Sequence, residues 1–138
     1  MIGMALHWWH GLVHRSAACR VVRRPELRDA LLGRARSALR AGELDGAEAL
    51  VMEYGDLAMS DAACLNVLGV IAEARGRWRE ARKFWGRAVR ADRKYEPAYQ
   101  NLRRYFELWQ WGRSECVRTL GDETALDLLR ARSIGRGY

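Results

Sequence analysis

The sequence predicts an all-α fold, an α-solenoid, from two observations. Apolar residues make up 49% of the 138 residues and proline occurs only twice, a composition that suits helices better than a many-turned β structure. Marker residues also recur at an interval of 34 residues, which is typical of stacked helical hairpins. The residues in register at this interval are Leu31, Leu65 and Tyr99, then Ala38, Ala72 and Phe106, and then Gly42 and Gly76.

This periodicity divides the chain into an N-terminal arm, a repeat region and a C-terminal cap. The arm covers 1–24, the repeats cover 25–112, and the cap and tail cover 113–138. Within the repeat region the units are 28–61, 62–95 and a partial third unit, 96–112. Two and a half to three repeats are close to the minimum for a stable stack, so we expect a partner or a second copy to complete the core.

The helix boundaries follow from the glycines, from Pro97 and from the spacing of apolar residues. Pro97 suits the first turn of a helix, because a proline lacks only a backbone N–H that has no partner there. Residues Ser133 to Tyr138 are expected to be a frayed tail. We expect helices over 28–41, 44–58, 62–75, 78–91 and 96–111, and two capping helices over 114–120 and 123–132.

Seven residues of the middle unit carry a known pattern of large and small side chains: Leu65, Leu68, Gly69, Gly76, Ala81, Trp85 and Ala88. In this pattern the chain resembles the tetratricopeptide repeat. The resemblance implies hairpins of two antiparallel helices that approach closely at Gly69 and Ala88. Leu65, Leu68, Trp78 and Trp85 are then expected to fill the space between the helices.

The resemblance also implies a concave groove lined by the first helix of each hairpin. The lining residues carried over are Leu32, Arg36, Leu39, Arg40, Asn66, Val70, Glu73, Gln100, Arg104, Glu107 and Leu108. This mixture fits an extended or helical peptide of a partner protein, with apolar anchors near Leu32, Leu39 and Val70. The carboxylate clamp of some relatives is absent, because Leu32 and Arg36 stand in place of its first Lys and Asn.

Aromatic residues are dense along the last repeat helix. Tyr99, Phe106 and Trp109 are expected to pack as core against the helix over 78–91. Tyr105 and Trp111 point elsewhere on the helical wheel. Two roles remain open for this second pair, exposed binding anchors or packing under the cap.

The N-terminal arm has an amphipathic pattern and is expected to be helical only when docked on something. Gly3 and Gly11 each weaken an isolated helix by about 1 kcal/mol. Its apolar side, which would bind a partner or a membrane surface, is formed by Ile2, Leu6, Trp8, Trp9, Leu12 and Val13. The polar side holds His7, His10 and His14, whose spacing could place three zinc ligands together. The polar edge of an amphipathic helix is the favoured interpretation, because the arm has no carboxylate to orient the rings.

Charge alternates along the chain, whose net charge is +7. Acidic residues Asp45, Glu48, Glu53 and Asp56 follow one helix, and a basic stripe follows the helix over 78–91 at Arg79, Arg82, Lys83, Arg87 and Arg90. The stripe could neutralise phosphates of a nucleic acid. A solvated charged face is favoured instead, because acidic residues are numerous. The opposite stripes also predict weak, salt-sensitive homo-oligomers.

Catalytic and metal chemistry find no support in the motifs. The chain has no glycine-rich phosphate loop and no nucleophile elbow, so we expect no enzymatic activity and no cofactor. Cys19, Cys64 and Cys116 form no CxxC pair, which favours a reducing compartment, and Cys64 takes a small core position. The expected function is that of an adaptor, scaffold or assembly subunit of a larger bacterial multi-subunit complex. The expected location is cytoplasmic, with peripheral attachment to the inner membrane as the alternative.

Overall fold

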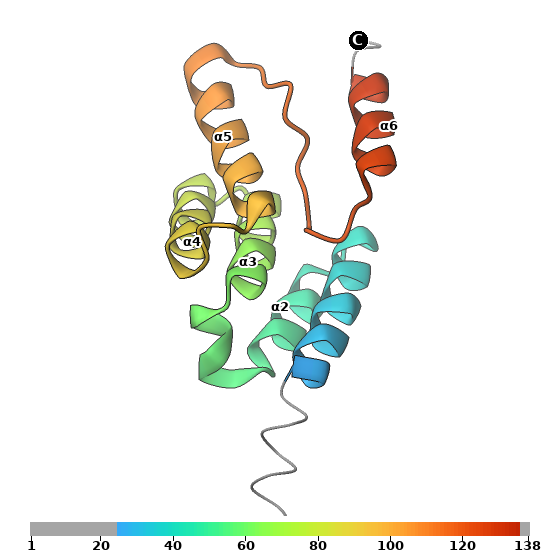
Figure 1. Ribbon diagram of the computed structural model, residues 1–138, viewed down its shortest axis with the longest axis vertical. Helices are drawn as coiled ribbons and strands as arrows, with labels where there is room; N and C mark the ends of the chain where they lie inside the picture. Colours follow the sequence, from blue (N-terminus) through green and yellow to red (C-terminus); the bar gives the residue numbers. More distant parts are fainter. Residues whose placement is uncertain (1–24, 136–138) are drawn as a thin grey trace, which may run out of the picture.

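The computed structural model describes residues 25–135, which form helices joined by loops and contain no β-strand (Figure 1). The all-helical prediction is therefore confirmed for this part of the chain. The elements in order are a helix over 25–40, α2 (Leu44–Met52), the short 3-10 helix η1 (Gly55–Ser60), α3 (Ala62–Ala74), α4 (Trp78–Ala91), α5 (Glu96–Trp111) and α6 (Ala125–Gly135). Within these residues, no helix is both long and apolar enough to cross a membrane.

The predicted boundaries of α3, α4 and α5 agree with the structure to within one residue. Asp61 caps α3, because its side chain accepts a hydrogen bond from the Cys64 amide at 3.0 Å. Pro97 lies in the first turn of α5, and Gly112 ends that helix with a φ of 67°. A left-handed φ of this kind carries almost no steric cost for glycine, so the sequence itself sets where α5 stops.

Two predicted helices are wrong. The helix expected over 44–58 ends at Met52, since a turn precedes Gly55, whose φ of 77° lies outside the helical region. The helix expected over 114–120 is absent, because several backbone groups of that segment bind side chains of other helices instead of one another. The second capping helix begins at Ala125 instead of 123 and reaches Gly135.

The centre of the described fold is α3, which is buried from Ala62 to Glu73. It packs most extensively on α4 and also contacts α2, η1 and α5. Trp85 of α4 lies directly over Gly69, where an added Cβ atom would come within 2.4 Å of the indole Nε1. The predicted close approach at Gly69 is confirmed, and Leu65, Leu68, Trp85 and Ala88 are all buried as expected.

The predicted core role of Tyr99, Phe106 and Trp109 is wrong. All three side chains are exposed, as is Trp78, and the exposed fraction of Trp109 is 80%. The physical reason is the path of the chain after α5. Beyond Gly112 the chain turns back along the opposite side of α5 (Figure 1), so among the described residues no further helix covers the side that α4 and α5 share.

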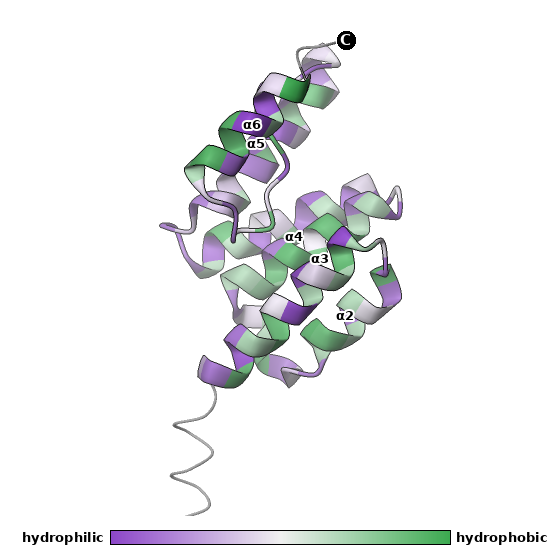
Figure 2. Cartoon of the chain, turned by 90° about the vertical axis from the view of Figure 1, so that its right-hand side faces the viewer, coloured by the Kyte–Doolittle hydropathy of each residue, from purple (hydrophilic) through white to green (hydrophobic). Residues whose placement is uncertain are grey.

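Helix α6 stands apart from the packed helices. It makes no packing contact with α2, η1, α3, α4 or α5, and Figure 1 shows it projecting beyond the end of the helix over 25–40. Figure 2 shows hydrophobic and hydrophilic residues alternating along α6. The expectation that this helix caps the stack finds no support in contacts with α2 to α5, and it stays a prediction.

Candidate functional site

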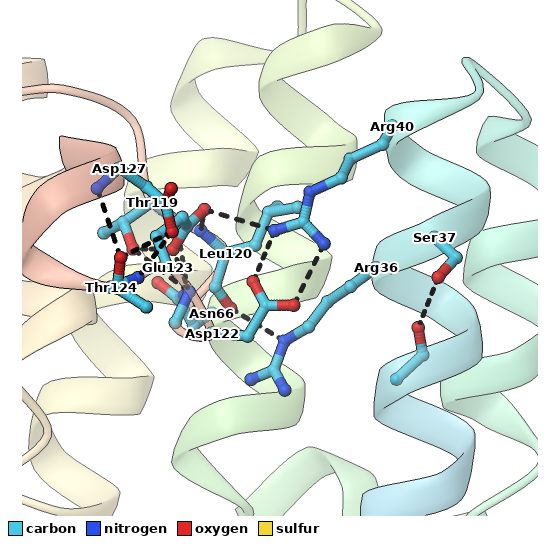
Figure 3. A network of polar contacts seen from close by, with 12 residues as sticks. Arg36, Ser37, Arg40, Asn66, Thr119, Leu120, Asp122, Glu123, Thr124 and Asp127 are labelled. Carbon is cyan, nitrogen blue, oxygen red and sulfur yellow. Dashed lines mark hydrogen bonds and ion pairs between the residues drawn. The ribbon is translucent and has the colours of Figure 1, made fainter. Parts of the chain in front are cut away.

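The face that was predicted as a peptide groove holds a segment of the chain itself, residues 117–123. Three groove side chains donate hydrogen bonds to backbone carbonyl oxygens of this segment. Arg36 Nε donates to Leu120 at 3.0 Å, Asn66 Nδ2 donates to Thr119 at 3.2 Å, and Gln100 Nε2 donates to Val117 at 3.0 Å. These contacts come from the helix over 25–40, from α3 and from α5. These three side chains are thus brought together around a segment of the chain itself, and Figure 3 shows Arg36 and Asn66 beside it.

Thr119 is the most enclosed residue of this segment, which we call the groove segment. Its amide donates to Asn101 Oδ1 at 2.9 Å, and Asn101 Nδ2 donates back to its carbonyl oxygen at 2.8 Å. Asn66 and Asn101 are fully buried. Sequence reasoning missed Asn101, although a polar residue between Ala98 and Leu102 on the inner side of α5 is a recognisable signal for a buried hydrogen bond.

Leu120 provides the apolar contact of the groove segment. It is buried in a cluster with Val70 and Trp85, and Leu39 packs against the same cluster. Two of the three predicted apolar anchors, Leu39 and Val70, therefore pack with Leu120 of the same chain. Leu32 instead lies in the core formed with α2 and α3 and is not available to an occupant of the groove.

A charged cluster closes the far end of the groove segment (Figure 3). Arg40 binds both carboxylate oxygens of Asp122, and these hydrogen bonds hold the pKa of Asp122 below its ordinary value. Burial by itself would raise the pKa of Glu123. Hydrogen bonds to its carboxylate from the Thr119 hydroxyl and from the amides of Leu120 and Gly121 outweigh burial, so the pKa of Glu123 is lowered.

The remaining predicted groove residues form ion pairs beside the groove segment. Arg104 pairs with the buried carboxylate of Glu73. Glu107 accepts from the Ser114 hydroxyl and from Arg103 Nε, at 2.6 and 2.7 Å, which together lower the pKa of Glu107. Leu108 is half-buried. Of these residues, Glu107 joins α5 to the loop that follows it, and the Arg104–Glu73 pair joins α5 to α3.

A second candidate site lies on the outer side of α4 and α5, which we call the cationic-aromatic face. It comprises Arg79, Arg82, Lys83, Arg87 and Arg90 of α4 together with Tyr105, Phe106 and Trp109 of α5. Two hollows lie on it, of about 460 and 390 Å³. The first is lined by Arg82, Lys83, Gly86, Arg87, Arg90, Leu102 and Phe106, and the second by Arg79, Arg82, Lys83, Tyr105, Phe106 and Trp109.

Sequence reasoning found the cations of this face and left Tyr105 open as a binding anchor, but it placed Phe106 and Trp109 in the core. The signal that was missed is the loss of the 34-residue period after Gly112. Without that period, the third hairpin has no second helix to cover α5. Of the two tyrosines that follow the stripe in the sequence, Tyr95 packs against the core and Tyr99 is exposed. Tyr105 is half-buried and Trp111 is exposed beside a different hollow.

The acidic stripe on α2 is partly neutralised within the molecule. Arg75 pairs with both Asp45 and Glu48, at 2.6 Å each. Glu53 and Asp56 are exposed and form no ion pair with any described residue. Only part of the predicted acidic surface is therefore available to a second copy, and the salt-sensitive oligomer stays a prediction.

The metal-site and arm predictions lie outside the described residues. They concern His7, His10 and His14 and the apolar side of 1–24. Within 25–135, no group of three or more His, Cys, Asp and Glu side chains could hold a metal ion. Cys64 is buried as expected, and burial, with Asp61 nearby, raises the pKa of its thiol to about 12.

Comparison with known proteins assigns no family to the chain. No family model matches it, and neither a curated protein nor a solved structure matches it. The candidate sites are supported by the geometry of the chain alone.

Proposed function

We propose that the chain is a non-enzymatic protein-interaction module, an adaptor or assembly subunit of a larger complex, built as a short right-handed stack of tetratricopeptide-like hairpins. The observation that carries this proposal is helix α6. It is held away from α2–α5 with Leu126, Leu129 and Ile134 each more than half exposed. Such a helix is a docking element rather than part of the core.

The short length of α6 supports the proposal that a partner packs on it. Isolated helices shorter than about 12–15 residues are marginal in water, and α6 has 11 residues. Its first turn is fixed, because the Asp127 amide donates to the Thr124 hydroxyl while the Asp127 carboxylate accepts from the Thr124 amide and hydroxyl. In the later turns Leu128 and Ala131 are half-buried, while Leu129 and Ile134 are exposed. A partner surface supplies packing for this exposed side.

The partner surface is an apolar groove with an acidic rim. Amphipathic helices commonly bind such grooves through apolar residues spaced three and four apart, as Leu126 and Leu129 are. Arg130 and Arg132 are exposed on the same helix, so carboxylates at the rim would complement them and speed the encounter.

The test is affinity purification of the tagged full chain from native lysate, followed by calorimetry with the purified partner. Wild type is compared with the double variant Leu126→Asp/Leu129→Asp and with Leu27→Asp, a matched control at an exposed leucine of another helix. We expect the double variant to weaken binding at least tenfold and the control to leave it unchanged. Equal binding by all three proteins, each folded by circular dichroism, would remove α6 as the docking element.

A further inference from the structure

The cations of the cationic-aromatic face have almost no acidic partners. Among the described residues, Arg79, Arg82, Lys83 and Arg90 form no ion pair, and Arg87 donates one hydrogen bond to the Met59 carbonyl oxygen at 2.9 Å. No carboxylate lines either hollow. The one acid of α4, Glu80, pairs with Arg77. The cations of this face are therefore available to pair with the anionic groups of a ligand.

The aromatic rings lie directly beside these cations. Tyr105 meets the exposed Phe106 edge to face, with ring centroids 5.4 Å apart and an interplanar angle of 82°, a favourable arrangement of two aromatic rings. Trp109 is the most exposed large apolar residue of the described chain. A row of cations next to open ring faces is the combination that binds single strands, since phosphates take the cations and bases stack on the rings.

From this juxtaposition we propose that the cationic-aromatic face binds single-stranded nucleic acid. Arg82, Lys83 and Phe106 line both hollows and so lie between them. One base occupies each hollow with Phe106 between the two, and the linking phosphate lies against Arg82 and Lys83. From Arg79 to Arg90 the cations extend about 16 Å along α4, at about 1.5 Å per residue, so further phosphates of the same strand are neutralised in turn.

The chemistry of the face favours this ligand over two others. A duplex keeps the faces of its bases stacked inside, so the rings would gain no stacking partner. An acidic polypeptide would neutralise the cations but offers no planar group to each hollow. The proposal concerns a surface separate from α6 and does not depend on the protein partner proposed above.

The experiment is fluorescence anisotropy of labelled 15-nucleotide oligo-dT and oligo-U titrated with the full chain at salt concentrations from about 50 to 300 mM. We expect saturable binding. The logarithm of the association constant should fall linearly with the logarithm of salt concentration, with a slope of about −0.7 per phosphate contact. Oligo-dU, which differs from oligo-U only in the sugar, is the third probe and identifies the sugar that the face prefers.

Variants separate stacking from charge. Trp109→Ala and Phe106→Ala are each expected to weaken binding about 5- to 150-fold, the loss of one stacked base, with the salt slope unchanged. The double variant Arg82→Ala/Lys83→Ala is expected to reduce the magnitude of the slope by about 0.7, because both cations contact the same linking phosphate. The matched controls are Trp111→Ala, an exposed tryptophan outside both hollows, and Arg130→Ala/Arg132→Ala, which removes the same charge from α6.

Three results would overturn the proposal. One is the absence of saturable binding of either probe at about 50 mM salt. Another is equal losses in the control and test variants, which would indicate attraction by net charge alone. The third is binding of poly-glutamate as tight as that of the oligonucleotides with no effect of Trp109→Ala, which would assign the face to an acidic polypeptide.

Discussion

Asn66 and Asn101 lie 35 positions apart in the chain, and Asn101 Nδ2 donates to both the Asn66 side-chain oxygen and the Thr119 carbonyl oxygen, each at 2.8 Å. The two amides belong to α3 and α5 and are fully buried. Buried amides are costly unless their hydrogen bonds are made. This pair therefore links α3 to α5 and also holds the groove segment at Thr119. Loss of the contact between the two amides should weaken the attachment of the groove segment as well.

Replacement of Asn101 by alanine is predicted to lower the free energy of unfolding by about 1–3 kcal/mol, because Asn66 and Thr119 would keep buried polar groups without partners. Urea unfolding measures this loss, and limited proteolysis of 112–124 reports release of the groove segment. The control is Gln110→Ala on the exposed side of the same helix, which should change stability by less than about 0.5 kcal/mol. Equal stability of the two variants would contradict a structural role for the amide pair.

The glycines offer a matched pair of substitutions with opposite signs. Gly69→Ala places a Cβ atom against the buried Trp85 ring and is predicted to destabilise the protein by about 1–3 kcal/mol. Gly33→Ala meets no atom within 4 Å and is predicted to stabilise its helix by about 0.5–1 kcal/mol. Both values come from urea unfolding. If Gly69→Ala proves as stable as the wild type, the close contact of α3 and α4 is not where the structure places it.

The carboxylates of Asp122 and Glu123 make attachment of the groove segment pH-dependent. Both have lowered pKa values in the folded chain, so their contribution is fully present above the ordinary carboxyl pKa of about 4. It is lost as the pH falls through the lowered values. Proteolysis of 112–124 by an acid-active protease is therefore predicted to rise sharply only below about pH 4.

Two variants test this pH dependence. Glu123→Gln keeps the side-chain shape and removes the charge, so it should make the segment more susceptible at neutral pH and flatten the acid response. Asp56→Asn, at an exposed carboxylate without an ion pair among the described residues, is the control and should leave the profile unchanged. A wild-type profile that shows no rise below pH 4 would contradict the assigned hydrogen bonds.

Cys64 is predicted to resist alkylation in the folded protein. Its thiol is buried and has a pKa raised to about 12, so almost no reactive thiolate exists at pH 8. Cys116, which is half-buried, serves as the internal control. Iodoacetamide labelling followed by peptide mass spectrometry should modify Cys116 first, and Cys64 only after addition of urea. Equal labelling rates without urea would show that the core around Asp61 opens readily.

Local patterns were enough to predict most of the helical framework. The positions of α3, α4 and α5 follow from spacings of three and four residues, from the cap at Asp61 and from Gly112, all of which act within a few residues of the chain. The contact of Gly69 with Trp85 follows from the repeat pattern, because a small residue opposite a large one sets how closely two helices approach. The grouping of Arg36, Asn66 and Gln100 on one face follows from the same period.

Tertiary structure alone decided what occupies that face and what stays uncovered. Residues 117–123 have no helical or strand period. Their conformation is fixed by hydrogen bonds to side chains as far as 84 positions away in the sequence, such as that of Arg36 with Leu120. Exposure of Phe106 and Trp109 depends on whether a later element crosses α5, and no pattern within α5 contains that information. Helix periodicity determined the elements of this protein, and the path of the chain after Gly112 determined which of its surfaces are free to bind.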